Sequence, residues 1–307
     1  MPPSNKIRDL FNVNQLVAVV TGGGSGLGLY AARALDANGA KAVYIVGRRE
    51  NILKEAAKTA TNGTIIPIVG DVTDKDSLAK VADQVRREQG YINLLLANAG
   101  VPGPRPDEHL SNDANSKPTI KEFQDACWEP GMDFFTSALN VNCTAVFYTT
   151  IAFLDLLDAG NKKRNVPQDS QILVTSSAAG FICSLNVGFA YSASKAGVTF
   201  LVKMLSTYFA QNKYHIRANV IAPGLYPSDM TTSATSNLNR FNVGLGYEGV
   251  FPDALAVPPQ VCPAERSGSA QDFAATVIFM TSQAGAYLNG EVLVTDGGLL
   301  GVEPGAY

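Results

Sequence analysis

The sequence has little of what several classes of protein require. It carries only four cysteines and two histidines in 307 residues. The cysteines are widely scattered and form no Cys-x-x-Cys pair, so we expect reduced, buried thiols rather than disulfides or a zinc site. The histidines, His109 and His215, lie in no metal-ligand pattern, and we expect chemistry without a metal. The four thiols are Cys127, Cys143, Cys183 and Cys262.

An excess of basic charge is also missing. The formal net charge is -3, charged residues make up 17% of the chain and hydrophobic residues 46%. This balance is typical of a soluble globular protein and gives no basic face for nucleic acid. The N-terminal segment MPPSNKIRDLFNVN lacks the apolar core of a signal peptide, and we see no apolar run near the roughly 18 residues of a membrane span. We therefore expect a cytoplasmic protein without a membrane or nucleic-acid partner.

Short apolar runs alternate with helical patterns along the chain. Runs that are apolar on both faces indicate buried parallel strands covered by helices. We predict an α/β fold with a Rossmann-type doubly wound parallel sheet of about seven strands and helices on both faces. The predicted strands are 16–21, 42–46, 65–69, 92–97, 171–175, 216–222 and 291–295. The predicted helices are 27–38, 50–60, 74–89, 122–158 with a break near Pro130-Gly131, 191–211 and 270–281.

Two stretches interrupt this alternation, at about 101–120 and 226–268. Both are rich in Pro, Gly, Ser and Asn, and long loops of this kind in a compact domain are typical of lids or binding loops. There is no internal repeat and no composition shift that would mark a boundary. We therefore predict one domain over residues 1–307, with these two stretches as substrate loops.

A glycine cluster, TGGGSGLG, occupies residues 21–28. Such clusters also make simple turns and linkers, and a P-loop is excluded because no GK[ST] follows. Here the cluster lies between a predicted strand and a predicted helix, which is the context that a dinucleotide site requires. Glycines there allow the backbone to approach a pyrophosphate, whose charge then faces the helix N-terminus.

The spacing Gly-x-x-x-Gly-x-Gly is the point at which the chain resembles a known family, the short-chain dehydrogenases/reductases. Further motifs follow in the order typical of that family, and together they cover nearly the whole chain. They are GDV at 70–72, NAG at 98–100, NVN at 140–142, SSAAG at 176–180, YSASK at 191–195, APG at 222–224 and LNGEVLVTDGG at 288–298.

The resemblance implies a nicotinamide dinucleotide as the cofactor. Its pyrophosphate would lie on the glycine loop, its adenine against Asp71 and Val72, and its ribose beside the segment from Asn98 to Gly100. Pro223 and Gly224 would hold the nicotinamide amide, with Ser228 standing where the family usually has threonine. The loop residues implied are Gly22, Ser25, Gly26, Leu27 and Gly28.

The end of the second predicted strand, YIVGRRE, bears on the choice between NADH and NADPH. Gly47 stands where the NAD-type members carry Asp, and Arg48 follows it, where an arginine would accept a 2′-phosphate. Arg49 can be read as a solvated charge, and Glu50 as a favourable acid in the first turn of the next helix. We predict NADPH rather than NADH.

Tyr191 and Lys195 are four apart on a predicted helix, so both side chains project from one face. Such pairs are common on helix surfaces, but this pair lies between two strands whose ends face the ligand crevice. A nearby ammonium should lower the pKa of a phenol, which is ordinarily near 10. Tyr191 could then exchange a proton with a carbonyl oxygen, and the resemblance implies that Lys195 also bonds the nicotinamide ribose.

Four serines lie within reach of this pair, Ser176, Ser177, Ser184 and Ser192, and strand position favours Ser177. Ser176 and Ser177 both end a predicted strand and should point to opposite faces, while the family pattern favours the second. Ser177 lies 14 positions before Tyr191, whereas the family usually has 13, a position that Ala178 holds. We explain this by one extra residue in the loop 181–189, which also contains Ser184.

The fourth residue of the implied catalytic set is Asn142. By resemblance it would kink a helix and hold a water against Lys195, and a helix-interior asparagine bonded to the backbone is the alternative. Asn140 is a nearby rival.

The function predicted is an NADPH-dependent reductase of ketones or aldehydes, or the reverse alcohol dehydrogenase. A non-redox enzyme of the epimerase or dehydratase type, or a catalytically silent nucleotide-binding regulator, is the alternative. Loop aromatics predict a bulky apolar or aromatic substrate, although loop core explains them equally well. They are Phe181, Phe189, Tyr226, Phe241, Tyr247 and Phe251.

The family also suggests a homo-tetramer or homo-dimer built on the long helices. The apolar residues of helix 191–211 fit this suggestion and fit core packing equally well. They are Phe200, Leu201, Met204, Leu205, Tyr208 and Phe209.

Overall fold

Seven parallel strands form one sheet at the centre of the computed structural model, which describes residues 4–106, 110, 117–184, 187–241 and 251–305. The strand order is β3-β2-β1-β4-β5-β6-β7, so the chain winds outward in two directions from β1. The predicted doubly wound sheet is confirmed. The strands are β1 (Val17–Thr21), β2 (Ala42–Gly47), β3 (Ile65–Val69), β4 (Leu94–Ala97), β5 (Gln171–Thr175), β6 (Arg217–Pro223) and β7 (Val292–Thr295).

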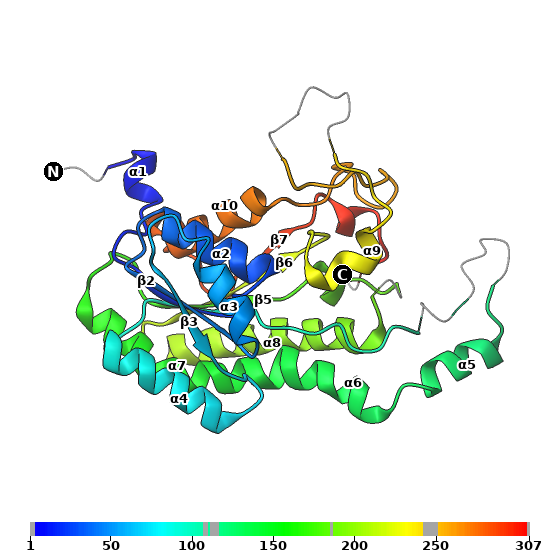
Figure 1. Cartoon of the computed structure of the whole chain (residues 1–307), viewed down its shortest axis with the longest axis horizontal. Coiled ribbons are helices and arrows are strands. Elements are labelled where there is room, and N and C mark those ends of the chain that lie inside the picture. The colour runs from blue at the N-terminus through cyan, green and yellow to red at the C-terminus, as the bar shows by residue number, and fades with distance from the viewer. Residues whose placement is uncertain (1–3, 107–109, 111–116, 185–186, 242–250, 306–307) are drawn as a thin grey trace.

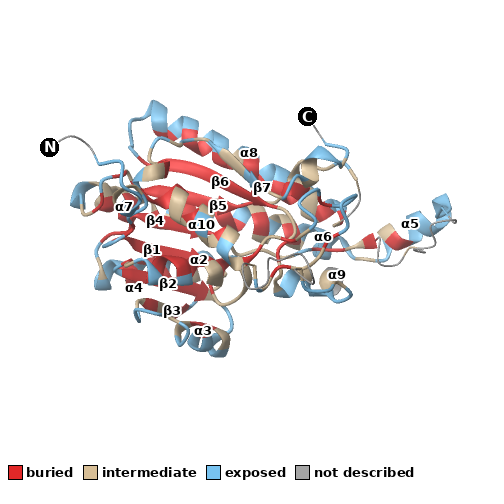
Figure 2. Ribbon diagram, turned by 90° about the horizontal axis from the view of Figure 1, so that it is seen from above, coloured by how far each residue is buried: buried red, intermediate tan, exposed pale blue. Residues whose placement is uncertain are grey.

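Helices cover both faces of the sheet (Figure 1). One layer consists of α2 (Gly26–Ala37), α3 (Glu50–Ala57) and α10 (Ala270–Thr281). The other consists of α4 (Lys75–Glu88), α7 (Ala145–Lys163) and α8 (Phe189–Gln211). Alternation along β1 shows why both faces are apolar, since Val17 and Val19 pack in one layer and Ala18 and Val20 in the other. Figure 2 shows the strands buried between these layers and the outer helix faces exposed.

The remaining elements are short or extend from the body. The predicted break at Pro130-Gly131 separates α5 (Ile120–Trp128) from α6 (Met132–Leu139). A π-helical turn, η2 (Asn140–Thr144), then joins α6 to α7, and α7 ends five residues beyond the predicted boundary. The other short helices are α1 (Ile7–Leu10), η3 (Ala178–Gly180), η4 (Asp229–Thr231), α9 (Thr232–Thr235), η5 (Gln283–Gly285) and η6 (Leu299–Gly301).

Two expectations about composition need correction. By length and composition alone, the helical stretch Met132–Lys163 is apolar enough to cross a membrane. In this fold its α7 part packs against α4, β4 and β5, as a core helix does. All four cysteines are free thiols, but only Cys262 is fully buried and Cys183 is exposed.

The sheet topology brings the functional motifs to one edge. The carboxyl ends of parallel strands meet at the same edge, and β1 and β4 are neighbours from which the chain departs in opposite directions. A crevice forms at such a switch point because the two crossover connections leave it on opposite faces. Thr21, Ala97 and Thr175 end the three central strands at this edge.

Candidate active site

A cleft of about 550 Å³ lies across the carboxyl ends of the central strands. It brings together residues that are far apart in the sequence, from the β1–α2 loop to η4. Predicted residues that line it are Gly22, Ser25, Gly26, Leu27, Arg48, Asp71, Val72, Asn98, Gly100, Ser177, Tyr191, Lys195, Pro223, Gly224 and Ser228. Gly28 and Asn142 are not among the lining residues, because both lie behind the wall of the cleft.

The β1–α2 loop forms a close-packed cradle that only glycine fits. Gly22 adopts a φ of 65°, and a Cβ there would meet the Ala99 Cα at 2.9 Å. A Cβ on Gly28 would lie 2.3 Å from the Gly22 carbonyl oxygen, so Gly28 lets α2 pack directly on the loop. Ser25 is the N-cap of α2 and its side chain makes no capping bond. The amides of this helix end therefore suit a pyrophosphate, and the cradle fits the implied dinucleotide.

Two exposed arginines, Arg48 and Arg49, and the carboxylates of Asp71 and Asp229 line the cleft. Arg48 is exposed at the rim, and its charge contributes to holding the pKa of Asp71 below its usual range, after the larger effect of hydrogen bonds from Thr73. Arg49 instead lies 3.8 Å from Asp229. Glu50 begins α3 as predicted and pairs with Lys54 at 2.6 Å. Arg48 is thus the arginine of the two that acts on Asp71, whereas Arg49 lies beside Asp229.

Asn98 and Gly100 shape the middle of the cleft. The Asn98 Nδ2 donates to the carbonyls of Thr21 and Gly22 at 3.2 and 3.3 Å, which ties β4 to the glycine loop. A Cβ on Gly100 would lie 3.2 Å from Asn142 Oδ1 and 3.6 Å from Lys195 Nζ. The glycine therefore leaves room for both polar side chains beside the ribose position.

Lys195 is a buried cation held by a main-chain carbonyl. It is 3% exposed, and its Nζ donates to the Thr175 carbonyl oxygen at 2.8 Å. Burial lowers the pKa of this ammonium to about 8. The group therefore gains and loses its proton within the range in which enzymes work.

Tyr191 lies one helical turn before Lys195, and its ring centroid is 5.6 Å from the Lys195 Nζ. Burial raises the pKa of the phenol above 10.0, while a hydrogen bond with Ser177 acts in the opposite direction. In the protein alone, the net shift of the Tyr191 pKa is therefore upward, opposite to the direction expected from Lys195, because burial dominates. Tyr191 is a protonated donor at neutral pH.

The two adjacent serines have different surroundings. The Ser176 Oγ donates to the Lys195 carbonyl at 2.9 Å and lies 2.7 Å from Thr199 Oγ1, so it fixes α8 to β5. The Ser177 Oγ instead accepts from the Ala179 amide at 3.1 Å and bonds Tyr191. Ser177 is therefore the hydroxyl that faces the proton donor.

Neither the position 13 before Tyr191 nor the loop serine takes this place. Ala178 begins η3 and offers no polar group. The Ser184 Oγ donates to Glu303 near the C-terminus at 2.7 Å.

Asn142 lies in the π-helical turn and is 1% exposed. Its Oδ1 accepts from the Val101 amide at 2.9 Å, and its Nδ2 donates to the Val101 carbonyl and to Ser194 Oγ, both at 2.9 Å. The residue thus lies at an interruption of the helix and bonds the backbone, while the water against Lys195 stays a prediction. Its rival Asn140 is exposed.

The cleft also contains residues that sequence reasoning missed. Val141, next to Asn142, lines it, as do Met230 and Thr231 after Ser228. Thr231 Oγ1 accepts from the Ser228 amide at 2.9 Å, so these two residues form one turn that lines the cleft. The short polar run after the APG motif was the sequence signal that could have predicted these residues. Gly70, which directly follows β3, also lines the cleft. The sequence pointed to it only as part of the GDV motif at 70–72.

The loop aromatics divide between structure and surface. Tyr226 is buried and packs edge-on against Phe273, with ring centroids 5.9 Å apart. Phe251 lies under the Arg266 guanidinium at 3.9 Å. Phe189 remains exposed beside Phe123, whereas Tyr247 lies outside the described residues. For Phe251, loop core is the better explanation, whereas Tyr226 both packs against α10 and lines the cleft.

A second cleft, of about 710 Å³, lies at the far end of the molecule between α7 and the segment that precedes β6. Ile151, Lys162 and His215 are among the residues that line it. It is larger than the first, but it contains none of the predicted site residues. The strand-end cleft is therefore the candidate active site.

Comparison with known proteins agrees with this geometry. The family model for the short chain dehydrogenases matches residues 16–239. The short-chain dehydrogenase/reductase PhomF′ of Diaporthe leptostromiformis is 43% identical over 306 residues, which are 99% of this chain and 98% of that protein. Levodione reductase of Leifsonia aquatica is 28% identical over 92% of this chain and 93% of its own length.

Solved structures show the same likeness. A crystal structure from Beutenbergia cavernae, assigned as an NAD(P)-dependent gluconate 5-dehydrogenase and containing bound NADP, is 25% identical. It covers 95% of this chain and 99% of its own, with a TM-score of 0.70. With the motifs, the sheet order and these matches in agreement, the chain belongs to the short-chain dehydrogenase/reductase family of oxidoreductases, whose members bind a nicotinamide dinucleotide.

Proposed function

We propose that this protein is an NADPH-dependent reductase that converts a bulky, largely apolar or aromatic ketone to its alcohol, and the reverse. The observation that carries the proposal is the meeting of Ser177, Tyr191 and Lys195 in one wall of the cleft that also contains the glycine cradle. Two hydroxyl donors and a cation at one point suit a carbonyl oxygen that gains negative charge.

Each catalytic side chain then has a defined task. The Ser177 hydroxyl donates to the carbonyl oxygen and fixes its position, and Tyr191 transfers its phenolic proton to that same oxygen. NADPH, when bound, supplies the hydride that the carbonyl carbon receives. The Lys195 ammonium stabilises the phenolate that remains on Tyr191, which would offset the desolvation that raises its pKa.

Asn142 acts as a positioning residue in this proposal. It bonds both Val101 and Ser194, and thereby holds the segment after β4 against α8 at the level of Lys195. Gly100 lies between them, where Lys195 could reach the ribose hydroxyls of the cofactor.

The proposed preference for NADPH rests on Arg48. Gly47 offers no carboxylate at the end of β2, and Glu50 is engaged with Lys54 on α3. A 2′-phosphate would meet the exposed guanidinium of Arg48 without facing an acidic side chain at the Gly47 position.

The proposed substrate class rests on one exposed apolar side chain in the cleft and one that is near it along the chain. Met230 lines the cleft and is 38% exposed, and Phe189, two residues before Tyr191 but not itself a lining residue, is 48% exposed. An apolar or aromatic ketone would cover these surfaces.

The catalytic proposal is tested with a carbonyl panel and Tyr191→Phe. With NADPH, the wild type should reduce bulky cyclic and aryl ketones in preference to small polar or CoA-linked carbonyls. The substitution removes the proton donor while keeping the ring, so kcat should fall about 10²–10⁴-fold. NADPH binding, followed by fluorescence titration, should change less than twofold. Unchanged turnover in Tyr191→Phe, or activity confined to small polar carbonyls, would contradict the proposal.

The pH dependence of reduction follows from the two pKa shifts. Burial raises the pKa of Tyr191, whereas burial lowers the pKa of Lys195 to about 8, so Lys195 loses its charge near pH 8. With ketone and NADPH both far below their KM, kcat/KM should therefore be level at neutral pH and fall as the pH rises through about 8. A profile that stays level from pH 6 to 10 would show that the Lys195 charge is not needed.

The cofactor preference is tested with Arg48→Gln and the neighbouring control Arg49→Gln. Loss of a charge-assisted contact should raise the KM for NADPH about tenfold or more in Arg48→Gln, with little effect on NADH. Arg49 pairs with Asp229 instead, so Arg49→Gln should change either KM by less than threefold. If wild-type kcat/KM favours NADH, Arg48 does not have this role.

We also propose a homo-dimer or homo-tetramer that pairs α7 and α8 between copies. On α8 the apolar residues separate into two faces, with Leu205 and Phe209 buried in the core. Phe200, Met204 and Tyr208 follow each other at intervals of four and are 66%, 55% and 56% exposed. Because α8 has one buried and one exposed apolar face, its apolar residues fit both core packing and dimerisation.

Light scattering tests the assembly. The wild type should have a mass of two or four times 32.5 kDa, and Phe200→Glu should reduce it. A wild-type mass of one chain at micromolar concentration would rule out this pairing.

A further inference from the structure

The last described segment, residues 296–305, leaves the sheet in a fixed direction. Asp296 follows β7, and its carboxylate accepts hydrogen bonds from the amides of Gly298 at 2.9 Å and Leu300 at 2.8 Å. These bonds close the turn that leads into η6. The segment therefore starts from a rigid point beside the carboxyl end of β7 and crosses toward β5.

The far end of this segment pairs with the loop that follows Ser177. The Cys183 amide donates to the Pro304 carbonyl at 2.8 Å, and Ile182 and Gly305 form an antiparallel bridge. The Ser184 hydroxyl donates to the Glu303 carboxylate at 2.7 Å. One short stretch of chain is thus bonded through both backbone and side chains to residues more than 100 positions later.

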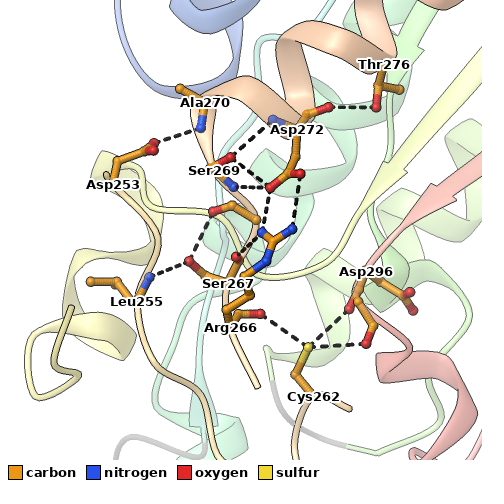
Figure 3. A network of polar contacts seen from close by, with 12 residues as sticks. Asp253, Leu255, Cys262, Arg266, Ser267, Ser269, Ala270, Asp272, Thr276 and Asp296 are labelled. Carbon is orange, nitrogen blue, oxygen red and sulfur yellow. Dashed lines mark hydrogen bonds and ion pairs between the residues drawn. The ribbon is translucent and has the colours of Figure 1, made fainter. Parts of the chain in front are cut away.

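The near end of the segment contacts the second substrate loop (Figure 3). The Cys262 Sγ lies 3.5 Å from the carbonyl oxygens of Asp296 and Gly297, and the Ala264 amide donates to Gly297 at 3.0 Å. This loop is itself anchored to α10 because Arg266 pairs with Asp272 at 2.6 Å. Residues 296–305 therefore connect the loop after Ser177 with the loop before α10.

The loop after Ser177 leaves directly from the cleft. Ser177 and Tyr191 both line the cleft, and residues 178–184 continue from Ser177. Gly180 packs against the backbone of Lys195, so the first turn of this loop is fixed by α8. From Ile182 to Ser184 the loop is bonded to residues 303–305, which makes that segment the natural support for the extra residue of the loop.

We propose that residues 296–305 form a strap that sets the shape of the substrate wall, with Ser184 and Glu303 as positioning residues that determine which ketones are accepted. This inference rests on the proposed reductase function. Without the Ser184–Glu303 bond the loop loses its side-chain anchor, and a bulky ketone that packs against the wall binds less tightly. A small ketone and NADPH do not depend on that wall.

The test compares Glu303→Ala, Ser184→Ala, the double variant and Glu303→Gln with the matched control Glu291→Ala. Glu291 is an exposed glutamate just before β7. The KM for a bulky ketone should rise about tenfold in both single alanine variants and no further in the double variant. Glu303→Gln keeps an acceptor and should restore most of the loss. The kcat for cyclohexanone and the KM for NADPH should stay within twofold throughout.

Hydrogen exchange gives a readout that does not require turnover. The Cys183 amide should exchange faster in Glu303→Ala than in the wild type, and not in Glu291→Ala. Unchanged exchange together with an unchanged KM for the bulky ketone would overturn the strap. A different outcome is faster exchange in Glu303→Ala together with a wild type that reduces no ketone at all. That result would overturn the reductase function and, with it, the role of the strap in substrate choice.

Discussion

The bond between the Lys195 ammonium and the Thr175 carbonyl is the interaction on which the site depends. A buried cation is unfavourable unless polar groups surround it, and here the carbonyl at the end of β5 provides the closest one. The bond exists only if α8 lies against the end of β5 at one height. Ser176 secures that height by bonding the Lys195 carbonyl, so the serine that is not catalytic in our proposal holds the lysine in place.

The rest of the site follows from that alignment. One turn before Lys195, the same helix places Tyr191 beside Ser177, which directly follows the serine that fixes the helix. Asn142 reaches across from the π-helical turn to Ser194, so the helix before β5 and the helix after it are joined at the same level. A shift of α8 by one residue would separate all these groups at once, because each depends on the same helix-to-strand alignment.

Much of this arrangement could be predicted from the sequence, because it rests on local patterns. Apolar runs and glycine positions predicted the sheet and the cradle, and the spacing of Tyr191 and Lys195 predicted that they share a face. Patterns could not predict the environment of Tyr226, whose burial depends on α10, more than 40 positions later. Nor could they predict the direction of the Tyr191 pKa shift, because desolvation depends on packing that no short motif specifies. The pairing of Ser184 with Glu303 spans 119 positions and has no sequence signal.

The central claim is that this cleft transfers a hydride to a carbonyl carbon and a proton from Tyr191 to its oxygen. The most direct test is a single-turnover reaction with NADPH carrying deuterium at the transferred position of the nicotinamide ring and a bulky ketone, analysed by mass spectrometry. We predict one deuterium on the carbinol carbon of the product for each NADPH consumed. A product formed without deuterium, or without loss of NADPH, would contradict the account and favour a non-redox reaction in the same cleft.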